Sequence, residues 1–191
     1  MPRAGLSSAS VVALALDVVD DDGWDALTLA AVATRAGVAV PSLYKHVAGL
    51  PALRREVASV CVDELTERLA EARGALVGAP AVLAMAQATR NLARQHPGRY
   101  QAAQGDWPLD PAADDLRARA ARAVDLMSAA VAELDVPAEC RIDAVRAVRA
   151  AVHGFVTLEL AGGFGMPHDV DTSFNYLITH LTTGLTARPA L

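Results

Sequence analysis

Alanine is the feature of this sequence that most restricts its fold. About a fifth of the 191 residues are alanine, whereas aromatic residues make up only 4%. Alanine has the highest helix propensity of the amino acids, because it loses no side-chain entropy in a helix. Leucine and valine supply much of the remaining apolar content, and no β-hairpin signature interrupts them. The sequence therefore predicts an all-α protein of about nine helices.

Helix boundary signals are clear near the N-terminus. Ser7 or Ser8 can cap a first helix by accepting a backbone hydrogen bond, and Gly23 ends it. Apolar residues recur at helical spacing between them, as a buried helix face requires. Thr28 then caps a second helix over residues 29–35. These signals predict two helices joined by a short connection.

A glycine and a proline separate the second helix from a short third one. Gly37 tolerates the positive φ of a tight corner, and Pro41 suits the first turn of a helix that runs to about residue 46. Two short helices around such a turn are typical of a helix-turn-helix, whose recognition helix enters the DNA major groove. The small, polar or basic residues expected on that helix are Ser42, Tyr44, Lys45 and His46.

The charge around this motif is opposite to that of the whole chain. The net charge is −5, yet residues 26–55 contain no acidic residue. Their four cations are Arg35, Lys45, Arg54 and Arg55. Because the local field decides where a polyanion docks, this window predicts a phosphate-binding face.

Longer helices are expected after residue 50. A fourth helix runs to about residue 73, and prolines at 80, 97, 111 and 137 mark later starts. Residues 162–167 form a loop, after which Asp169 or Asp171 caps a last helix to about residue 185. We expect a DNA-binding domain over 1–49 and a second helical domain over 50–191.

Three runs in order resemble the DNA-binding signature of the TetR family: Gly23–Ala33, Ala36–Val38 and Ser42–Val47. The resemblance implies a transcriptional regulator, most simply a repressor, that binds a double-stranded palindromic operator as a homodimer. Thr28 would touch a phosphate, Tyr44 and His46 would contact the DNA backbone, and Lys45 would reach a phosphate or a base edge. The full set of implied DNA-binding residues is Thr28, Arg35, Val40, Pro41, Ser42, Tyr44, Lys45 and His46.

The sequence departs from this signature in two places. Ala39, Val40 and Pro41 stand where many family members have hydroxyl or glycine residues. The lysine that often begins the fourth helix is replaced by Gly49-Leu50-Pro51, so Arg54 or Arg55 would have to substitute for it. These departures leave open an alternative, a TetR-fold ligand sensor or interaction protein that has lost specific DNA binding.

The C-terminal half resembles the ligand-binding and dimerisation half of one TetR subgroup, through residues 149–155 and 158–162. The resemblance implies a homodimer through the last two long helices, roughly 137–161 and 171–187. It also implies a small-molecule effector of unknown identity. The residues expected around that effector are Met85, Tyr100, Trp107, Met127, His153 and Phe155.

Other classes of protein find little support in the sequence. No nucleophile–base pair, phosphate-cradling glycine loop or metal-ligand spacing is present, so we expect no enzyme, no cofactor and no metal. The two thiols, Cys61 and Cys140, are isolated and favour a reducing compartment. No apolar run is long enough to cross a membrane. We therefore expect a cytoplasmic protein with no membrane partner.

Overall fold

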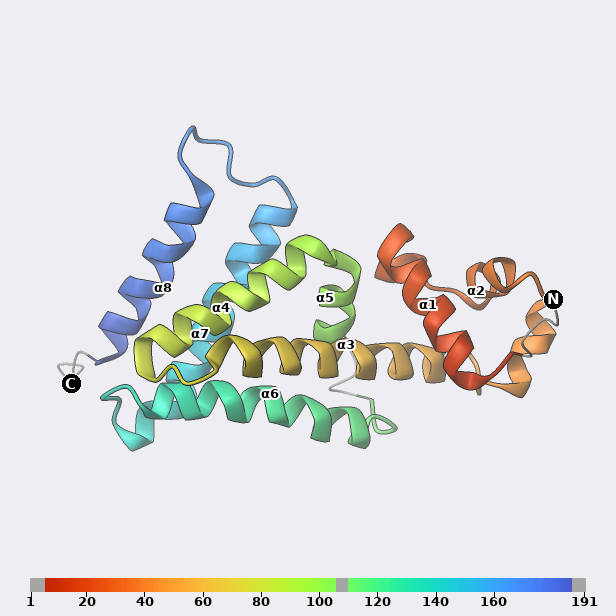
Figure 1. Cartoon of the computed structure of the whole chain (residues 1–191), viewed down its shortest axis with the longest axis horizontal. Helices are drawn as coiled ribbons and strands as arrows, with labels where there is room; N and C mark the ends of the chain where they lie inside the picture. Colours follow the sequence, from red (N-terminus) through yellow and green to blue (C-terminus); the bar gives the residue numbers. More distant parts are fainter. Residues whose placement is uncertain (1–5, 106–109, 187–191) are drawn as a thin grey trace. The chain divides into compact units, whose positions relative to one another are not determined.

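A computed structural model describes residues 6–105 and 110–186 of the chain. Over these residues the chain forms eight α-helices and three short 3₁₀ segments, with no strand (Figure 1). The predicted all-α class is confirmed. Trp107, one of the residues predicted to line an effector pocket, lies outside the described residues. None of the described helices is long and apolar enough to span a lipid bilayer.

The chain divides into two compact units that alternate along the sequence. The first unit combines residues 1–64 with 96–119, and the second combines 65–95 with 120–191. Helices α3 (Leu50–Arg73) and α6 (Asp114–Ala132) each contribute residues to both units. The compact units therefore do not follow a single cut after residue 49, and the functional division at that position stays a prediction.

Local capping explains the first two helices. Helix α1 (Ser8–Asp22) begins with a capping box, in which the Ser7 hydroxyl accepts from the Ser10 N–H and the Ser10 hydroxyl accepts from the Ser7 N–H. A short 3₁₀ segment, η1 (Trp24–Ala26), follows. Helix α2 (Leu29–Ala36) is capped by the Thr28 hydroxyl, which accepts from the Ala31 N–H across 3.1 Å. The predicted caps at Ser7 and Thr28 are confirmed.

The third helix of the motif is a short 3₁₀ segment. Gly37 has the expected positive φ, 66°, and ends α2. The next segment, η2 (Val40–Lys45), is a 3₁₀ helix with Pro41 in its first turn. A six-residue segment is too short for α-helical hydrogen bonds to offset the cost of nucleation, whereas i→i+3 bonds close within a single turn. The predicted position is right, and the structure adds the 3₁₀ type, which the sequence did not specify.

Of the later helices predicted from prolines, one begins at its proline and the others begin near one. Helix α4 (Gly78–Gln95) starts before Pro80, and α5 (Pro97–Gln104) starts at its proline. Asp110 closes a turn by accepting from the Ala112 N–H across 2.9 Å, so α6 starts only at Asp114. A proline therefore marks the neighbourhood of a helix start, while hydrogen bonding fixes the first helical residue.

The last two long helices are α7 (Arg141–Leu160), preceded by the 3₁₀ segment η4 (Ala138–Cys140), and α8 (Val170–Thr186). A loop over 161–169 joins them, as predicted. Asp169 caps α8, because its carboxylate accepts from the Thr172 N–H across 2.6 Å. Hydrogen bonds from the side chain and from the backbone N–H of Thr172 lower the pKa of Asp169. In the second unit, α4 packs against both α7 and α8.

Candidate nucleic-acid interface

The segment η2 presents a polar edge while one of its side chains anchors it. Leu43 is fully buried, and Tyr44 beside it has 60% of its surface exposed. Pro41 and Lys45 are also exposed, whereas Val40, Ser42 and His46 are half-buried. Six of the eight residues predicted to bind DNA lie on this segment or at its C-cap, whereas Thr28 caps α2 and Arg35 lies in its last turn. The six surround a single apolar contact to the core of the first unit.

Helix α1 supports the end of this segment directly. The Ser8 hydroxyl donates to the backbone carbonyl of His46 across 2.9 Å, over a sequence separation of 38 residues. Val47, the next residue, is buried, and its N–H bonds back to the Leu43 carbonyl across 3.0 Å. The exposed residues Tyr44 and Lys45 are therefore held between two anchored positions.

The four cations of the 26–55 window have different surroundings. Arg35 donates to Asp21 across 2.6 Å and lies 3.5 Å from a carboxylate oxygen of Asp22, and the bond to Asp21 raises the pKa of Arg35. Arg55 forms an ion pair with Asp110 across 2.9 Å. The partners Asp21, Asp22 and Asp110 all lie outside the 26–55 window. Two of its four positive charges are therefore offset within the protein.

The other two cations keep their charge uncompensated. Arg54 donates to the Leu27 carbonyl across 3.3 Å and stacks over the Trp24 ring at 5.1 Å, and it has no carboxylate partner among the described residues. Lys45 forms no ion pair within 6–105 and 110–186, and its side chain is exposed. Lys45 is therefore the cation best placed to meet a phosphate.

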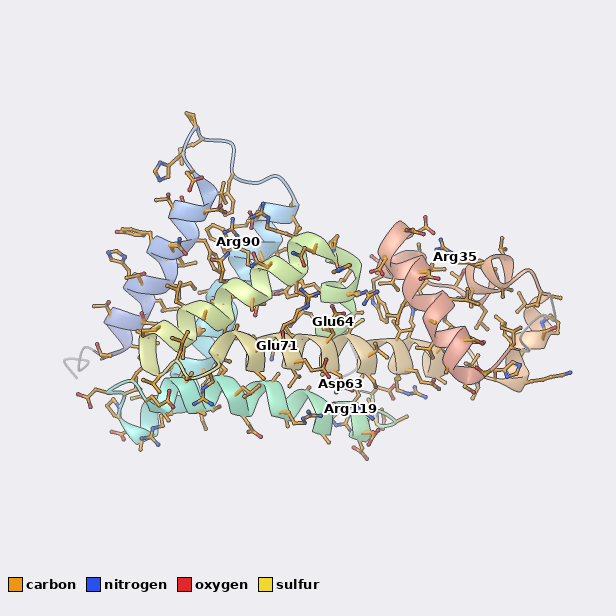
Figure 2. All side chains as sticks on the ribbon, viewed as in Figure 1. Arg35, Asp63, Glu64, Glu71, Arg90 and Arg119 are labelled. Carbon is orange, nitrogen blue, oxygen red and sulfur yellow. The ribbon has the colours of Figure 1, made fainter. Side chains whose placement is uncertain are left out.

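Helix α5 adds a set of contacts to α1 that the sequence does not signal. Arg99 donates twice to Asp20, across 2.8 and 2.5 Å, and once to Glu64 of α3 across 2.9 Å. These bonds lower the pKa of Asp20, to which the nearby ring of His96 also contributes. The acidic run that ends α1 is thus matched by cations from α2 and α5. Two residues of this group, Arg35 and Glu64, are labelled in Figure 2.

A glycine allows α5 to lie directly on α1. A Cβ at Gly98 would stand 2.2 Å from the backbone oxygen of Val19 and 3.0 Å from its side chain. Only glycine fits such an approach without moving the backbone of one helix. The contact between α1 and α5 depends on Gly98, Arg99 and Asp20. No local sequence pattern marks these residues, so the contact could not be predicted from the sequence.

The residues predicted for an effector pocket fall in both units. Met85 of α4 and Phe155 of α7 are buried in the second unit, and Met127 of α6 is half-buried there. Tyr100 of α5 is buried in the first unit. His153 is exposed on α7, so it is not enclosed with the others.

Helix α2, the turn at Gly37 and segment η2 form a helix-turn-helix. Leu43 anchors η2 in the core, and Tyr44 and Lys45 are exposed beside it, as in a DNA-binding regulator of this class. The chain matches the family described as bacterial regulatory proteins, tetR family, over residues 11–47. It matches the tetracyclin repressor-like C-terminal domain over residues 82–181. The chain belongs to the TetR family of helix-turn-helix transcriptional regulators. Members of this family are regulators and not enzymes.

Individual relatives agree with this assignment. The chain is 36% identical to an uncharacterized HTH-type transcriptional regulator of Mycobacterium tuberculosis, Rv0681, over 97% of this chain and 84% of that protein. A solved structure of a protein with unknown function from Rhodococcus sp. RHA1 has a TM-score of 0.82 and 24% identity, covering 98% of this chain and all of that one. A TetR variant from Acinetobacter baumannii AYE, solved in complex with minocycline, has a TM-score of 0.67 and 21% identity, covering 94% and 96% of the two chains.

Proposed function

We propose that the protein is a ligand-responsive repressor that binds a palindromic operator as a homodimer. The observation that carries this proposal is the pair of exposed side chains, Tyr44 and Lys45, on a segment whose neighbour Leu43 is fully buried. An exposed tyrosine and a lysine with no ion-pair partner add nothing to the stability of the described part of the chain. Both suit the sugar-phosphate backbone of DNA.

The remaining contacts follow from what each side chain offers. Lys45 and Tyr44 bind phosphates, and Ser42 and Val40 lie nearest to base edges, with Pro41 and His46 beside them. The Thr28 hydroxyl accepts from the Ala31 N–H, which leaves its own hydrogen free to donate to a phosphate. For Arg35 we propose a structural role, since its donors are directed at Asp21 and Asp22.

A homodimer is supported by the outer faces of α7 and α8. From residue 172 to residue 186, α8 contains no Asp, Glu, Lys or Arg. Tyr176 is 64% exposed on this helix and stacks on His180, with 3.7 Å between the ring centroids. On α7, Gly154 is exposed, and a Cβ added there would meet no atom within 4 Å. Depletion of charged residues is a feature of a surface that a second copy covers, and a glycine there leaves room for a partner helix to approach closely.

Ligand response is supported by apolar side chains, buried or half-buried, on helices of the second unit. Met85, Met127 and Phe155 lie on three different helices of the second unit, and the TetR variant of similar fold was solved with minocycline bound. We propose that a small apolar or aromatic compound binds among these helices and favours a conformation with poor operator affinity. Such coupling in regulators is typically about 1–3 kcal/mol.

One observation favours the alternative of a sensor without specific DNA binding. Two of the four cations in the 26–55 window are paired with carboxylates, which weakens the positive field that would attract DNA. Loss of that field lowers nonspecific and specific affinity alike. The salt dependence of binding distinguishes the two candidates.

The decisive experiment is selection of random DNA duplexes by the purified protein at two salt concentrations. We expect enrichment of a palindrome whose affinity falls steeply as salt rises, because a dimer neutralises phosphates in two half-sites. Enrichment of a single, asymmetric half-site would contradict the dimer. No enrichment even at low salt would reject the repressor and leave the ligand sensor.

A further inference from the structure

A fully buried arginine joins three helices of the second unit. Arg90 of α4 has no exposed surface. Its Nε and Nη2 donate to the two carboxylate oxygens of Glu159 on α7, across 2.7 and 2.6 Å. Nη2 also lies 2.7 Å from a carboxylate oxygen of Asp171 on α8. One guanidinium thus contacts the last turn of α7 and the first turn of α8 (Figure 2).

All three phenylalanines of the chain gather around this arginine. The guanidinium lies 4.9 Å from the ring centre of Phe174 and 5.6 Å from that of Phe155. The ring of Phe155 stands 5.0 Å from Phe174 and 4.6 Å from Phe164, which belongs to the 161–169 loop. Aromatic residues make up only 4% of the sequence, and three of them meet at this one place. This cluster orders both helix ends and the loop between them.

This cluster is built for geometry more than for stability. A buried ion pair gives up the hydration of both charges, and apolar replacements of equal volume are often as stable. Here the Nη1 of Arg90 is buried with no hydrogen-bond partner within 6–105 and 110–186, which adds a further desolvation cost. The planar fork of an arginine, in contrast, fixes the direction of every group that it contacts. The arrangement therefore fixes the ends of α7 and α8 relative to α4.

These two helices are the ones whose outer faces we assign to the homodimer. We infer that Arg90 is a positioning residue that sets how α7 and α8 pair, and thereby shapes the surface bound by a second copy of this chain. The inference rests on the proposed homodimer. Arg90 itself touches no partner, because it is buried within its own protomer.

The chain supplies a matched control one turn along the same helix. Arg94 approaches the same two carboxylates, Glu159 at 3.9 Å and Asp171 at 3.5 Å, but its side chain is 50% exposed. Water can replace these longer contacts, so they add little to the geometry. Removing Arg90 leaves Glu159, which is 16% exposed, without its close partner, whereas removing Arg94 does not.

The test compares the full-length wild type with Arg90→Met, Arg94→Met and the milder Glu159→Gln. Circular dichroism establishes helix content, hydrogen exchange by mass spectrometry reports on residues 155–175, and sedimentation equilibrium gives the dimer dissociation constant. We expect Arg90→Met to keep its helices, to exchange faster at the ends of α7 and α8, and to dimerise at least about tenfold more weakly. Arg94→Met should match the wild type in all three measurements.

Each outcome separates this inference from the proposed dimer. If the wild type is monomeric at all concentrations, the homodimer proposal and the dimer part of this inference fail together, and hydrogen exchange alone decides whether Arg90 positions the helices. If the wild type dimerises and Arg90→Met dimerises equally well, the inference is overturned while the homodimer stands. Should Arg90→Met fail to fold, Glu159→Gln carries the same comparison, and an unchanged dissociation constant overturns the inference.

Discussion

The guanidinium of Arg35, near the end of α2, donates to the carboxylate of Asp21, near the end of α1, across 2.6 Å. Asp21 lies in a run of three aspartates at the C-terminal end of α1, where the helix dipole disfavours negative charge. Arg35 offsets that repulsion and ties the first two helices together. Its charge is therefore engaged within the protein.

We predict that Arg35→Ala leaves the salt dependence of operator binding unchanged. The variant loses a partly exposed ion pair, which water and salt screen, so its free energy of unfolding should fall only slightly. Affinity measured at several salt concentrations gives the slope. A slope reduced in the variant would mean that Arg35 leaves Asp21 and binds a phosphate when DNA is present.

Lys45→Ala should weaken binding to every DNA sequence by a similar factor. Each phosphate contact contributes roughly 0.9 to the slope of log affinity against log salt, so a dimer that loses two contacts should show a slope reduced by about 2. Fluorescence anisotropy with a specific and a random duplex measures both effects. Arg94→Ala, which removes an exposed cation in the second unit, serves as the control. A change confined to the specific duplex would show that Lys45 reads a base.

Tyr44→Ala should abolish operator binding while the fold survives. The side chain is 60% exposed, so the free energy of unfolding should change by no more than about 0.5 kcal/mol. No operator binding should be measurable at protein concentrations that saturate the operator with wild type. Tyr44→Phe, which keeps the ring and removes the hydroxyl, separates packing from hydrogen bonding. A large drop in melting temperature for Tyr44→Ala would instead identify a core residue.

Asp20→Asn should destabilise the protein at neutral pH but not in acid. Hydrogen bonds from Arg99 lower the pKa of Asp20 below its ordinary value of 3.8. The ionised carboxylate therefore contributes stability above that value, and the contribution disappears as the pH falls through the lowered pKa of the folded state. At pH 7 the loss should be about 1–3 kcal/mol. Urea unfolding at several pH values measures the difference between wild type and variant, which should shrink towards zero in acid.

The control for this prediction is Asp17→Asn on the same helix. Asp17 is exposed and makes no hydrogen bond within the described part of the chain. Because its substitution breaks no hydrogen bond, it should destabilise the protein at neutral pH much less than Asp20→Asn does. An equal effect of both substitutions would assign the pH dependence to the net charge of α1 rather than to the pair of Asp20 and Arg99.

Gly98→Ala should destabilise the first unit. The new Cβ would lie 2.2 Å from the Val19 carbonyl oxygen, so α5 must move away from α1, at a cost of about 1–3 kcal/mol. Gly165→Ala is the comparison, because that glycine has no positive φ and a Cβ there would meet nothing within 4 Å. Chemical unfolding measures both variants. Equal stability of Gly98→Ala and the wild type would mean that α5 does not rest on α1 as described.

The elements that the sequence predicted correctly are those set by neighbouring residues. Ser7 and Thr28 cap their helices, and Gly37 takes a left-handed conformation. Each signal acts through backbone groups no more than four residues away, so it can be recognised before any tertiary contact exists. Segment η2 was located by the same kind of signal, Pro41, but its 3₁₀ geometry was not.

Charge could not be assigned in the same way. The window 26–55 carries four cations and no acid, yet Arg35 and Arg55 are paired with Asp21 and Asp110, which lie outside it. A count over a stretch of chain does not include partners that folding brings in. The positive surface available to DNA is accordingly smaller than the sequence indicated.

The sequence by itself determined the helical class, the order of the helices near the N-terminus and the segment that presents Tyr44 and Lys45, because propensity, capping and spacing are local properties. Only the tertiary structure decided which ionised groups meet. Arg99 finds Asp20 over 79 residues of separation, and Arg90 finds Glu159 over 69. Such pairs form because packing brings together charges that no local pattern places near one another, and their energy depends on how far the fold buries them rather than on the sequence around either residue.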